Sequence, residues 1–207
     1  MARNTRPFAV KGINIVSPQG KASWCKVNEP DTMFNDKGIL STGLICDPKD
    51  PPVQAFIERL EELRDLALAE TVETLGAKTK GIKARDVYTD EIVNGEETGN
   101  IIFKFALKDI ETRTAEGRQD SIMVVDAKKN KIDKVPNVGN GSVIRCASYA
   151  NPYYMANTKE VGISLIWSKM QLIELVEFSG GGGDFDEEDG YSSTSKVKEA
   201  VKEEDDF

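Results

Sequence analysis

The sequence predicts an all-β fold with one inserted helix, in which the strands form a closed or partly closed antiparallel barrel. Short runs with apolar side chains at alternate positions recur along the chain, and turns rich in Gly, Pro and Asn separate them. Only residues 51–75 have the apolar spacing of a long helix. The strand–helix–strand alternation of a parallel sheet does not occur, which favours the antiparallel barrel.

Three strands are predicted before the helix. Residues 7–16 form the first, which ends in the turn at 17–20, and a weaker second strand lies around 24–27. The third strand, 37–46, alternates strictly, so that one of its faces is largely apolar. That face carries Leu40, Thr42, Leu44 and Cys46, and the other carries Lys37, Ile39, Ser41 and Gly43.

The helix is predicted from about residue 51 to 75. Asp50 can cap its first turn, Pro51 is compatible with that turn, and Gly76 is expected to end the helix. Apolar and acidic side chains occupy opposite sides, which indicates an amphipathic helix that packs on the sheet with its acids in water. The apolar side consists of Val53, Phe56, Ile57, Leu60, Leu63 and Ala67, and the acids are Glu58, Glu61, Glu62 and Asp65.

After the helix, residues 76–99 are expected to have little structure, and four more strands follow. These lie at 101–109, 121–125, 142–149 and 160–178, and the strand at 121–125 is expected to be fully buried. Two of the strands place basic or aromatic side chains on one face. These are Lys104 and Lys108 in one strand, and Arg145 and Tyr149 in the other.

The net charge of −8 ordinarily argues against a nucleic-acid partner, but it is unevenly distributed. Residues 184–207 carry −7 and residues 1–183 carry −1. Within the latter, the segment 47–75 carries −5, so the remainder is at +4. The glycine run at 180–183 and the polar, acidic composition after it predict a flexible linker and a disordered tail at 180–207, and a folded domain at 1–179.

Catalysis is not predicted. The chain has no histidine, which excludes Ser-His-Asp and Cys-His chemistry and any zinc site that contains histidine. Phosphate-binding glycine loops and spaced calcium-binding loops are also absent from the sequence. We therefore expect no enzyme activity, no cofactor and no metal. Cys25, Cys46 and Cys146 are odd in number and widely spaced, which predicts free thiols used for packing in a reducing compartment. Neither a membrane span nor a secretory signal is expected.

Binding of single-stranded nucleic acid is the favoured chemistry. It requires lysines or arginines that follow the phosphate backbone and aromatic rings on which bases stack. The alternative is a structural or scaffold protein with a similar barrel, in which each of these side chains is merely solvated or packed. By pattern alone, Trp167 is assigned to the core, because it follows Ile166 in a strongly apolar strand. The candidates are Lys37, Lys104, Lys108, Arg145, Tyr149, Tyr153 and Tyr154, with Arg3, Arg6 and Lys11 near the first strands.

The order and spacing of several motifs resemble the single-stranded DNA-binding proteins of short-tailed, podovirus-type bacteriophages. The resemblance covers most of the chain, from the basic start at 1–3 to the acidic end. Its motifs are Lys37-Gly38, Cys46-Asp47-Pro48-Lys49-Asp50-Pro51, Ile102-Phe103-Lys104-Phe105, Val124-Val125-Asp126, Val135-Pro136-Asn137-Val138-Gly139-Asn140-Gly141-Ser142, Pro152-Tyr153, Val161-Gly162-Ile163-Ser164-Leu165, and Gln171-Leu172-Ile173-Glu174-Leu175.

This resemblance implies a five-stranded antiparallel OB-fold barrel with the helix inserted. It implies a protein of DNA replication, recombination and repair that coats and anneals single strands in the cytoplasm of the infected bacterial host. It also implies a homodimer whose acidic tail contacts the phage DNA polymerase and helicase/primase. The tail residues concerned are Glu203, Glu204, Asp205, Asp206 and Phe207.

The resemblance further implies which residues bind DNA. By position these are Arg3, Lys37, Arg145 and Tyr153. Two positions depart from the family pattern, because Met155 stands where a stacking tryptophan is expected and Tyr154 replaces a lysine. We hypothesise that Tyr154 or Trp167 supplies the missing ring. We also expect the tail, a line of negative charge with an aromatic ring, to occupy the basic groove when DNA is absent.

Overall fold

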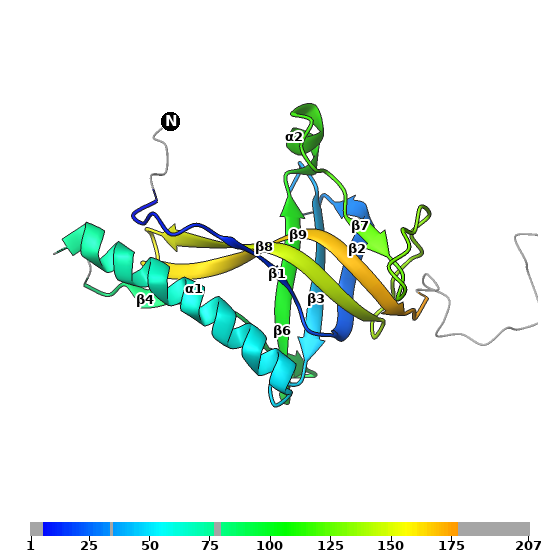
Figure 1. Ribbon diagram of the computed structural model, residues 1–207, viewed down its shortest axis with the longest axis horizontal. Helices are drawn as coiled ribbons and strands as arrows, with labels where there is room; N and C mark the ends of the chain where they lie inside the picture. Colours follow the sequence, from blue (N-terminus) through cyan, green and yellow to red (C-terminus); the bar gives the residue numbers. More distant parts are fainter. Residues whose placement is uncertain (1–5, 34, 77–79, 178–207) are drawn as a thin grey trace, which may run out of the picture.

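The computed structural model describes residues 6–33, 35–76 and 80–177, so Arg3 and the segment 180–207, with its candidate tail residues, lie outside the described part. The described chain is mostly β, with one long helix and one short one (Figure 1). The strands are β1 Ile13–Val16, β2 Gly20–Asp31, β3 Ile39–Cys46, β4 Lys83–Ala84, β5 Thr89–Val93, β6 Glu96–Lys108, β7 Met123–Val125, β8 Val143–Met155 and β9 Glu160–Glu174. The helices are α1 Pro51–Leu75 and α2 Ile110–Ala115.

Five of the strands pair in a closed ring. β2 pairs with β3, β3 with β6, β6 with β9, β9 with β8, and β8 with β2 again. All these pairs are antiparallel except β6 with β9, which is parallel. The ring closes unevenly, because β8 and β9 pair along almost their whole length, whereas the β2–β8 and β6–β9 ladders are short. The β8–β9 hairpin crosses β3 and β6 and extends beyond them alongside α1 (Figure 1).

The core fills the inside of this ring. The predicted inward faces of β3 and β6 are buried, and Trp167 of β9 is fully buried among them, as expected. The helix α1 joins the core through Phe56, whose ring meets that of Phe103 edge to face at a centroid distance of 5.0 Å. Such edge-to-face pairs are favourable because the positive ring edge meets the negative ring face.

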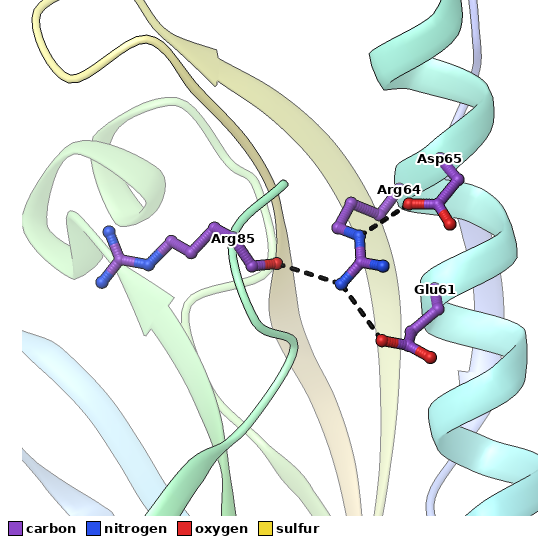
Figure 2. A network of polar contacts seen from close by, with 4 residues as sticks. All are labelled: Glu61, Arg64, Asp65 and Arg85. Atoms are coloured by element: carbon purple, nitrogen blue, oxygen red, sulfur yellow. Dashed lines mark hydrogen bonds and ion pairs between the residues drawn. The ribbon is translucent and has the colours of Figure 1, made fainter. Parts of the chain in front are cut away.

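Arg64 holds α1 against the segment that follows it. Its Nε donates to Asp65 Oδ1 at 2.8 Å, and its Nη1 contacts Glu61 Oε1 at 3.2 Å and donates to the Arg85 carbonyl at 3.3 Å (Figure 2). The Arg64 side chain is only 9% exposed. Burial disfavours its charge, but the bonds and charges of Asp65 and Glu61 outweigh burial and raise the pKa of Arg64.

Several sequence-based expectations are confirmed. The helix spans Pro51–Leu75 and ends at Gly76, whose φ of 53° is the left-handed conformation that favours glycine. The three cysteines are free thiols, and Cys46 and Cys146 are buried. The expected capping by the Asp50 side chain is wrong, because that side chain makes no capping hydrogen bond; the Asp50 carbonyl instead accepts from the Val53 and Gln54 amides.

Other expectations about the strands are wrong. The first strand is shorter than 7–16, and the second, β2, is longer than 24–27. Residues 76–99 contain β4, β5 and the start of β6, because β5 completes a hairpin with β6. The strand at 121–125 shrinks to β7, and it is not fully buried, since Met123 is 46% exposed. Among the strands of the described part it pairs only with β9, and residues 131–132 add an isolated bridge between Val125 and Lys131 and a hydrogen bond from the Ile132 amide to the Val124 carbonyl at 2.9 Å.

Candidate nucleic-acid interface

The outward face of β8 brings together three of the predicted residues. Alternate residues of a strand point to the same side, and the buried members of β8 from Ile144 to Pro152 are the even-numbered ones. Arg145, Tyr149 and Tyr153 are therefore on the outward side. Their partners on β9 are Gln171, Ile166 and Gly162.

Two glycines make room for the tyrosine rings of this row. A Cβ atom on Gly162 would lie 2.6 Å from the Tyr153 Oη, so the Tyr153 ring lies over the glycine of the neighbouring strand. A Cβ atom on Gly12 would lie 2.7 Å from the Tyr149 ring and 2.4 Å from the Ala150 carbonyl oxygen. Each tyrosine ring thus packs against the backbone of a glycine. Tyr149 is 37% exposed, and Tyr153 is half-buried. Rings held in this way are pre-positioned for stacking.

A second set of cations lies on the outward face of β2, β3 and β6. Lys104 is opposite Gly43, and Lys108 is opposite Ile39. On the other side of β3, Lys26 is opposite Ser41 and Lys21 is opposite Ile45. The parallel pairing of Ala106 with Ile166 joins this lysine face to the β8–β9 face, because Ile166 is also the partner of Tyr149. The register therefore connects the lysines and tyrosines around one side of the barrel.

Lys37 and Lys108 line one open hollow of about 550 Å³ at the end of β3 and β6. The amide of Glu111 donates to the Lys37 carbonyl at 2.9 Å, which ties the β2–β3 loop to α2. Asp36 and Asp109 line the same hollow, so its lysine charges are locally balanced. The hollow thus brings two predicted residues together without making a strongly basic pocket.

The candidate cations are available to a polyanion. Within the described residues, Lys37, Lys104, Lys108 and Arg145 make no ion pair. Arg145 Nε donates to the Ser17 carbonyl at 3.1 Å, which fixes its position without neutralising its charge. By contrast, the cations near the tip of the β8–β9 hairpin are paired. These are Lys83 and Arg85, which contact the Glu160 carboxylate at 3.4 and 3.7 Å.

An acidic hairpin limits the lysine face at β5 and β6. Glu91 accepts from Thr98 Oγ1 at 2.6 Å and from Asn100 Nδ2 at 3.0 Å. These hydrogen bonds hold the pKa of Glu91 below its usual range, and the charge of Lys21 lowers it further. The Glu91 carboxylate would repel a phosphate backbone, so we place the basic surface on the side of β6 away from β5.

The structure does not bring Tyr154 or Trp167 to this face. Trp167 is 0% exposed, and its Nε1 donates to the Lys169 carbonyl at 3.1 Å, so no face of its ring is available for stacking. Tyr154 points to the opposite side of β8 from Tyr153 and packs in a small cluster with Phe8 and Val161. Neither side chain replaces the expected tryptophan in this conformation.

Sequence reasoning missed three residues of the lysine face. Lys21 and Lys26 belong to β2, whose length was underestimated, and Trp24 lies between them with 78% of its surface exposed. Lys21 and Lys26 are five positions apart, so strict alternation would put them on opposite faces, and only the register shift between Ser23 and Lys26 brings both outward. The exposure of Trp24 carried no signal in the sequence, because strict alternation after the buried Ala22 would turn Trp24 inward.

The remaining polar groups do not form a rival site within the described ranges. No group of three or more His, Cys, Asp or Glu side chains there could hold a metal ion. Burial raises the pKa of Cys25 to about 11 and that of Cys46 to about 12, which favours the protonated thiols near neutral pH. No helix of the described part is long and apolar enough to cross a membrane.

Comparisons with known proteins agree on one family. The family model described as the single-stranded DNA-binding protein of bacteriophage T7 matches residues 19–176. The single-stranded DNA-binding protein of Enterobacteria phage T3 is 29% identical over 186 residues, which cover 85% of this chain and 80% of that protein. Its counterpart from Escherichia phage T7 is 27% identical over 181 residues, or 83% and 78% of the two chains.

Solved structures share the fold. The crystal structure of gp2.5, a single-stranded DNA-binding protein encoded by bacteriophage T7, aligns with a TM-score of 0.64 and 24% identity over 88% of this chain and all of that one. The single-stranded DNA-binding protein from bacteriophage Enc34, in complex with single-stranded DNA, aligns with a TM-score of 0.52 and 11% identity over 84% and 96% of the two chains.

Proposed function

The chain belongs to the family of single-stranded DNA-binding proteins of bacteriophage T7, and from this premise we propose that it coats and anneals single strands, independently of sequence, during phage DNA replication, recombination and repair. The observation that carries the proposal is the continuous outward surface on β2, β3, β6 and β8, where glycine-backed tyrosines lie beside cations that make no ion pair among the described residues. Such a surface binds any single strand, because phosphates and base faces occur in every sequence.

We assign the ring of β2, β3, β6, β9 and β8 to an OB-type barrel. The order of the strands in the ring and its single parallel pair support this assignment. OB barrels bind ligands on the outward face of their second and third strands, which here are β3 and β6. Lys104 and Lys108 are on that outward face, and Lys37 is in the loop that leads into β3.

Each residue predicted from the sequence to bind DNA has a part in this proposal. Lys37, Lys104, Lys108 and Arg145 contact phosphates, and Arg3 adds a further cation from the N-terminal segment. Tyr149 and Tyr153 stack on bases. Tyr154 does not stack on bases but packs with Phe8 and Val161 on the opposite side of β8, which stabilises the strand that carries Tyr149 and Tyr153.

The acidic tail acts in this proposal as a competitor for the DNA surface. Its charge of −7 resembles a short stretch of phosphates, and Phe207 resembles a base. The tail leaves the surface when DNA binds and then contacts the phage DNA polymerase and helicase/primase in the cytoplasm of the infected host. A homodimer would allow the tail of one subunit to cover the surface of the other. Deletion of 184–207 should tighten DNA binding, most strongly at low salt, and unchanged affinity would contradict the competition.

Equilibrium titration of the full chain with fluorescently labelled oligothymidine tests the main proposal. The four described cations alone predict that the logarithm of the binding constant falls with the logarithm of salt concentration at a slope of about −3, or about 0.7 for each phosphate, and Arg3 should make the slope steeper. Absence of salt-dependent binding would favour the alternative, an OB-like structural or scaffold protein.

A further inference from the structure

Trp24 is an exposed aromatic side chain in an unusual backbone conformation. It is 78% exposed, and its φ of 49° lies in the left-handed region that bulky residues rarely adopt. Residues held in such conformations cluster at functional sites, provided that the surrounding structure enforces the conformation.

A β-bulge turns Trp24 outward. The pairing of β2 with β3 is regular from Lys21 to Ser23 and shifts before Lys26, which is opposite Ser41. Trp24 and Cys25 are thus both opposite the single residue Thr42, which is the arrangement of a β-bulge. Cys25 turns inward and packs against the core, so the extra residue, Trp24, is left on the outside.

The segment before β8 holds the bulge in place. The amide of Trp24 donates to Asn140 Oδ1 at 2.8 Å. The amide of Ala22 donates to the Ser142 carbonyl at 2.7 Å, and the amide of Gly141 donates to the Ala22 carbonyl at 2.9 Å. The Trp24 amide, which a bulge would otherwise leave unpaired, is therefore satisfied. The backbone under the ring is fixed, and only the side chain is free to contact a ligand.

The surroundings of Trp24 are basic and low in relief. Ser23 and Lys26 flank the bulge on the outward side of β2, and their partners on β3 are Gly43 and Ser41. Gly43 is in turn opposite Lys104 on β6, and a Cβ atom on Gly43 would lie 3.1 Å from Ile102 Cγ2. The Trp24 indole thus borders a strip of small residues on β2 and β3. Lys26 lies on one side of this strip and Lys104 on the other, and neither makes an ion pair among the described residues.

We propose that Trp24 is a base-stacking site for single-stranded DNA. The ring offers an open π-face, and Lys26 and Lys104 are placed to contact the phosphates on either side of a stacked base. This inference rests on the proposed function, and it adds a contact on β2 to those on β6 and β8. The bound strand then runs from the tyrosines of β8 across β6 and β3 to the bulge.

The test compares wild-type protein with Trp24→Ala and Trp24→Phe in titrations with labelled oligothymidine. Trp24→Ala should bind about 5- to 150-fold more weakly, which is the range for loss of one base–aromatic stack, and Trp24→Phe should recover part of that loss. Trp24→Asn, which adopts a positive φ more readily than tryptophan, should fold normally and bind as weakly as Trp24→Ala. Leu66→Ala is the matched control, since Leu66 is 60% exposed on α1.

An abasic oligomer of equal length separates stacking from charge. It retains the phosphates, so the wild type and Trp24→Ala should bind it equally. Equal binding of oligothymidine by both proteins would overturn the inference and leave the indole free for a protein partner. An equal loss on both oligomers would also overturn it, since the effect would not depend on bases. If the wild type itself lacks salt-dependent binding, the proposed function fails first.

Intrinsic fluorescence gives an independent readout. The chain has two tryptophans, and Trp167 is fully buried. Oligothymidine should quench the wild-type emission through the Trp24 ring, whereas Trp24→Ala, which reports Trp167 alone, should show little quenching. Equal quenching in both proteins would contradict the stacking at Trp24. The Trp167 emission also verifies that each variant is folded.

Discussion

Replacing Lys104 by glutamine should weaken binding of single-stranded DNA and reduce its salt dependence. Lys104 is exposed in the middle of β6, opposite Gly43, and it makes no ion pair within the described residues. The substitution keeps most of the aliphatic stem and removes the charge. Because the side chain is exposed, the free energy of unfolding should change by less than about 0.5 kcal/mol.

The magnitude follows from the release of counterions. One phosphate contact on a single strand contributes about 0.7 to the slope of the logarithm of the binding constant against that of salt. At 0.1 M salt, relative to 1 M, this amounts to about 5-fold in affinity, or about 1 kcal/mol. Lys104→Gln should therefore bind about 5-fold more weakly at 0.1 M salt, and the difference should vanish near 1 M.

Fluorescence anisotropy with oligothymidine at four salt concentrations measures both quantities. Lys83→Gln is the matched control, since Lys83 is also an exposed lysine of the sheet but pairs with Glu160 at 3.4 Å. Its slope should equal that of the wild type. An unchanged slope in Lys104→Gln, or an equal change in Lys83→Gln, would refute the placement of the DNA on β6.

Three further outcomes are expected. Gly162→Ala should leave the fold intact but displace the Tyr153 ring, because the new Cβ would lie 2.6 Å from the Tyr153 Oη. The loss of oligothymidine affinity should approach that of Tyr153→Ala, about 1–3 kcal/mol. Wild-type affinity in Gly162→Ala, with weakened binding in Tyr153→Ala, would contradict this. Arg64→Met should lower the free energy of unfolding, measured in urea, by about 2 kcal/mol, because a buried charged hydrogen bond is lost. Arg59 is exposed, so Arg59→Met should lower it by less than about 0.5 kcal/mol. Equal effects of the two substitutions would refute the anchoring of α1 by Arg64. The free energy of unfolding should fall as pH rises from about 9 towards 12, because the folded state keeps the Cys46 proton that the unfolded chain releases. The fall should be shallower in Cys46→Ala. An identical fall in both proteins would contradict the raised pKa of Cys46.

The sequence predicted the faces of the strands better than their ends. Alternation correctly identified the buried sides of β3 and β6 and the outward row of Arg145 and Tyr149, because burial on one side of a strand imposes a period of two residues. The helix was also predicted, since its apolar stripe and Gly76 are local signals. Strand ends depend on pairing partners far along the chain, so β5, β2 and the full length of β8 were not predictable from local pattern.

Two features of the candidate surface required the three-dimensional structure. Trp24 faces outward only because a bulge adds one residue to β2, and this bulge depends on Asn140, which lies 116 residues later. Tyr154 follows Tyr153 directly and so points to the other side of β8, where Phe8 and Val161 cover it. Neighbouring aromatic residues in a strand thus have different surroundings, and the sequence alone does not indicate which of them binds a ligand.

Lysine footprinting tests the central claim most directly, namely that single-stranded DNA lies across the outward face of β2, β3, β6 and β8. The full chain is acetylated with and without saturating oligothymidine, and mass spectrometry gives the rate at each lysine. We expect protection of Lys26, Lys104 and Lys108, and unchanged rates at Lys83 and at Lys159, which donates to the Lys80 carbonyl away from this face. Protection confined to Lys83 and Lys159, or equal at all five lysines, would contradict the account.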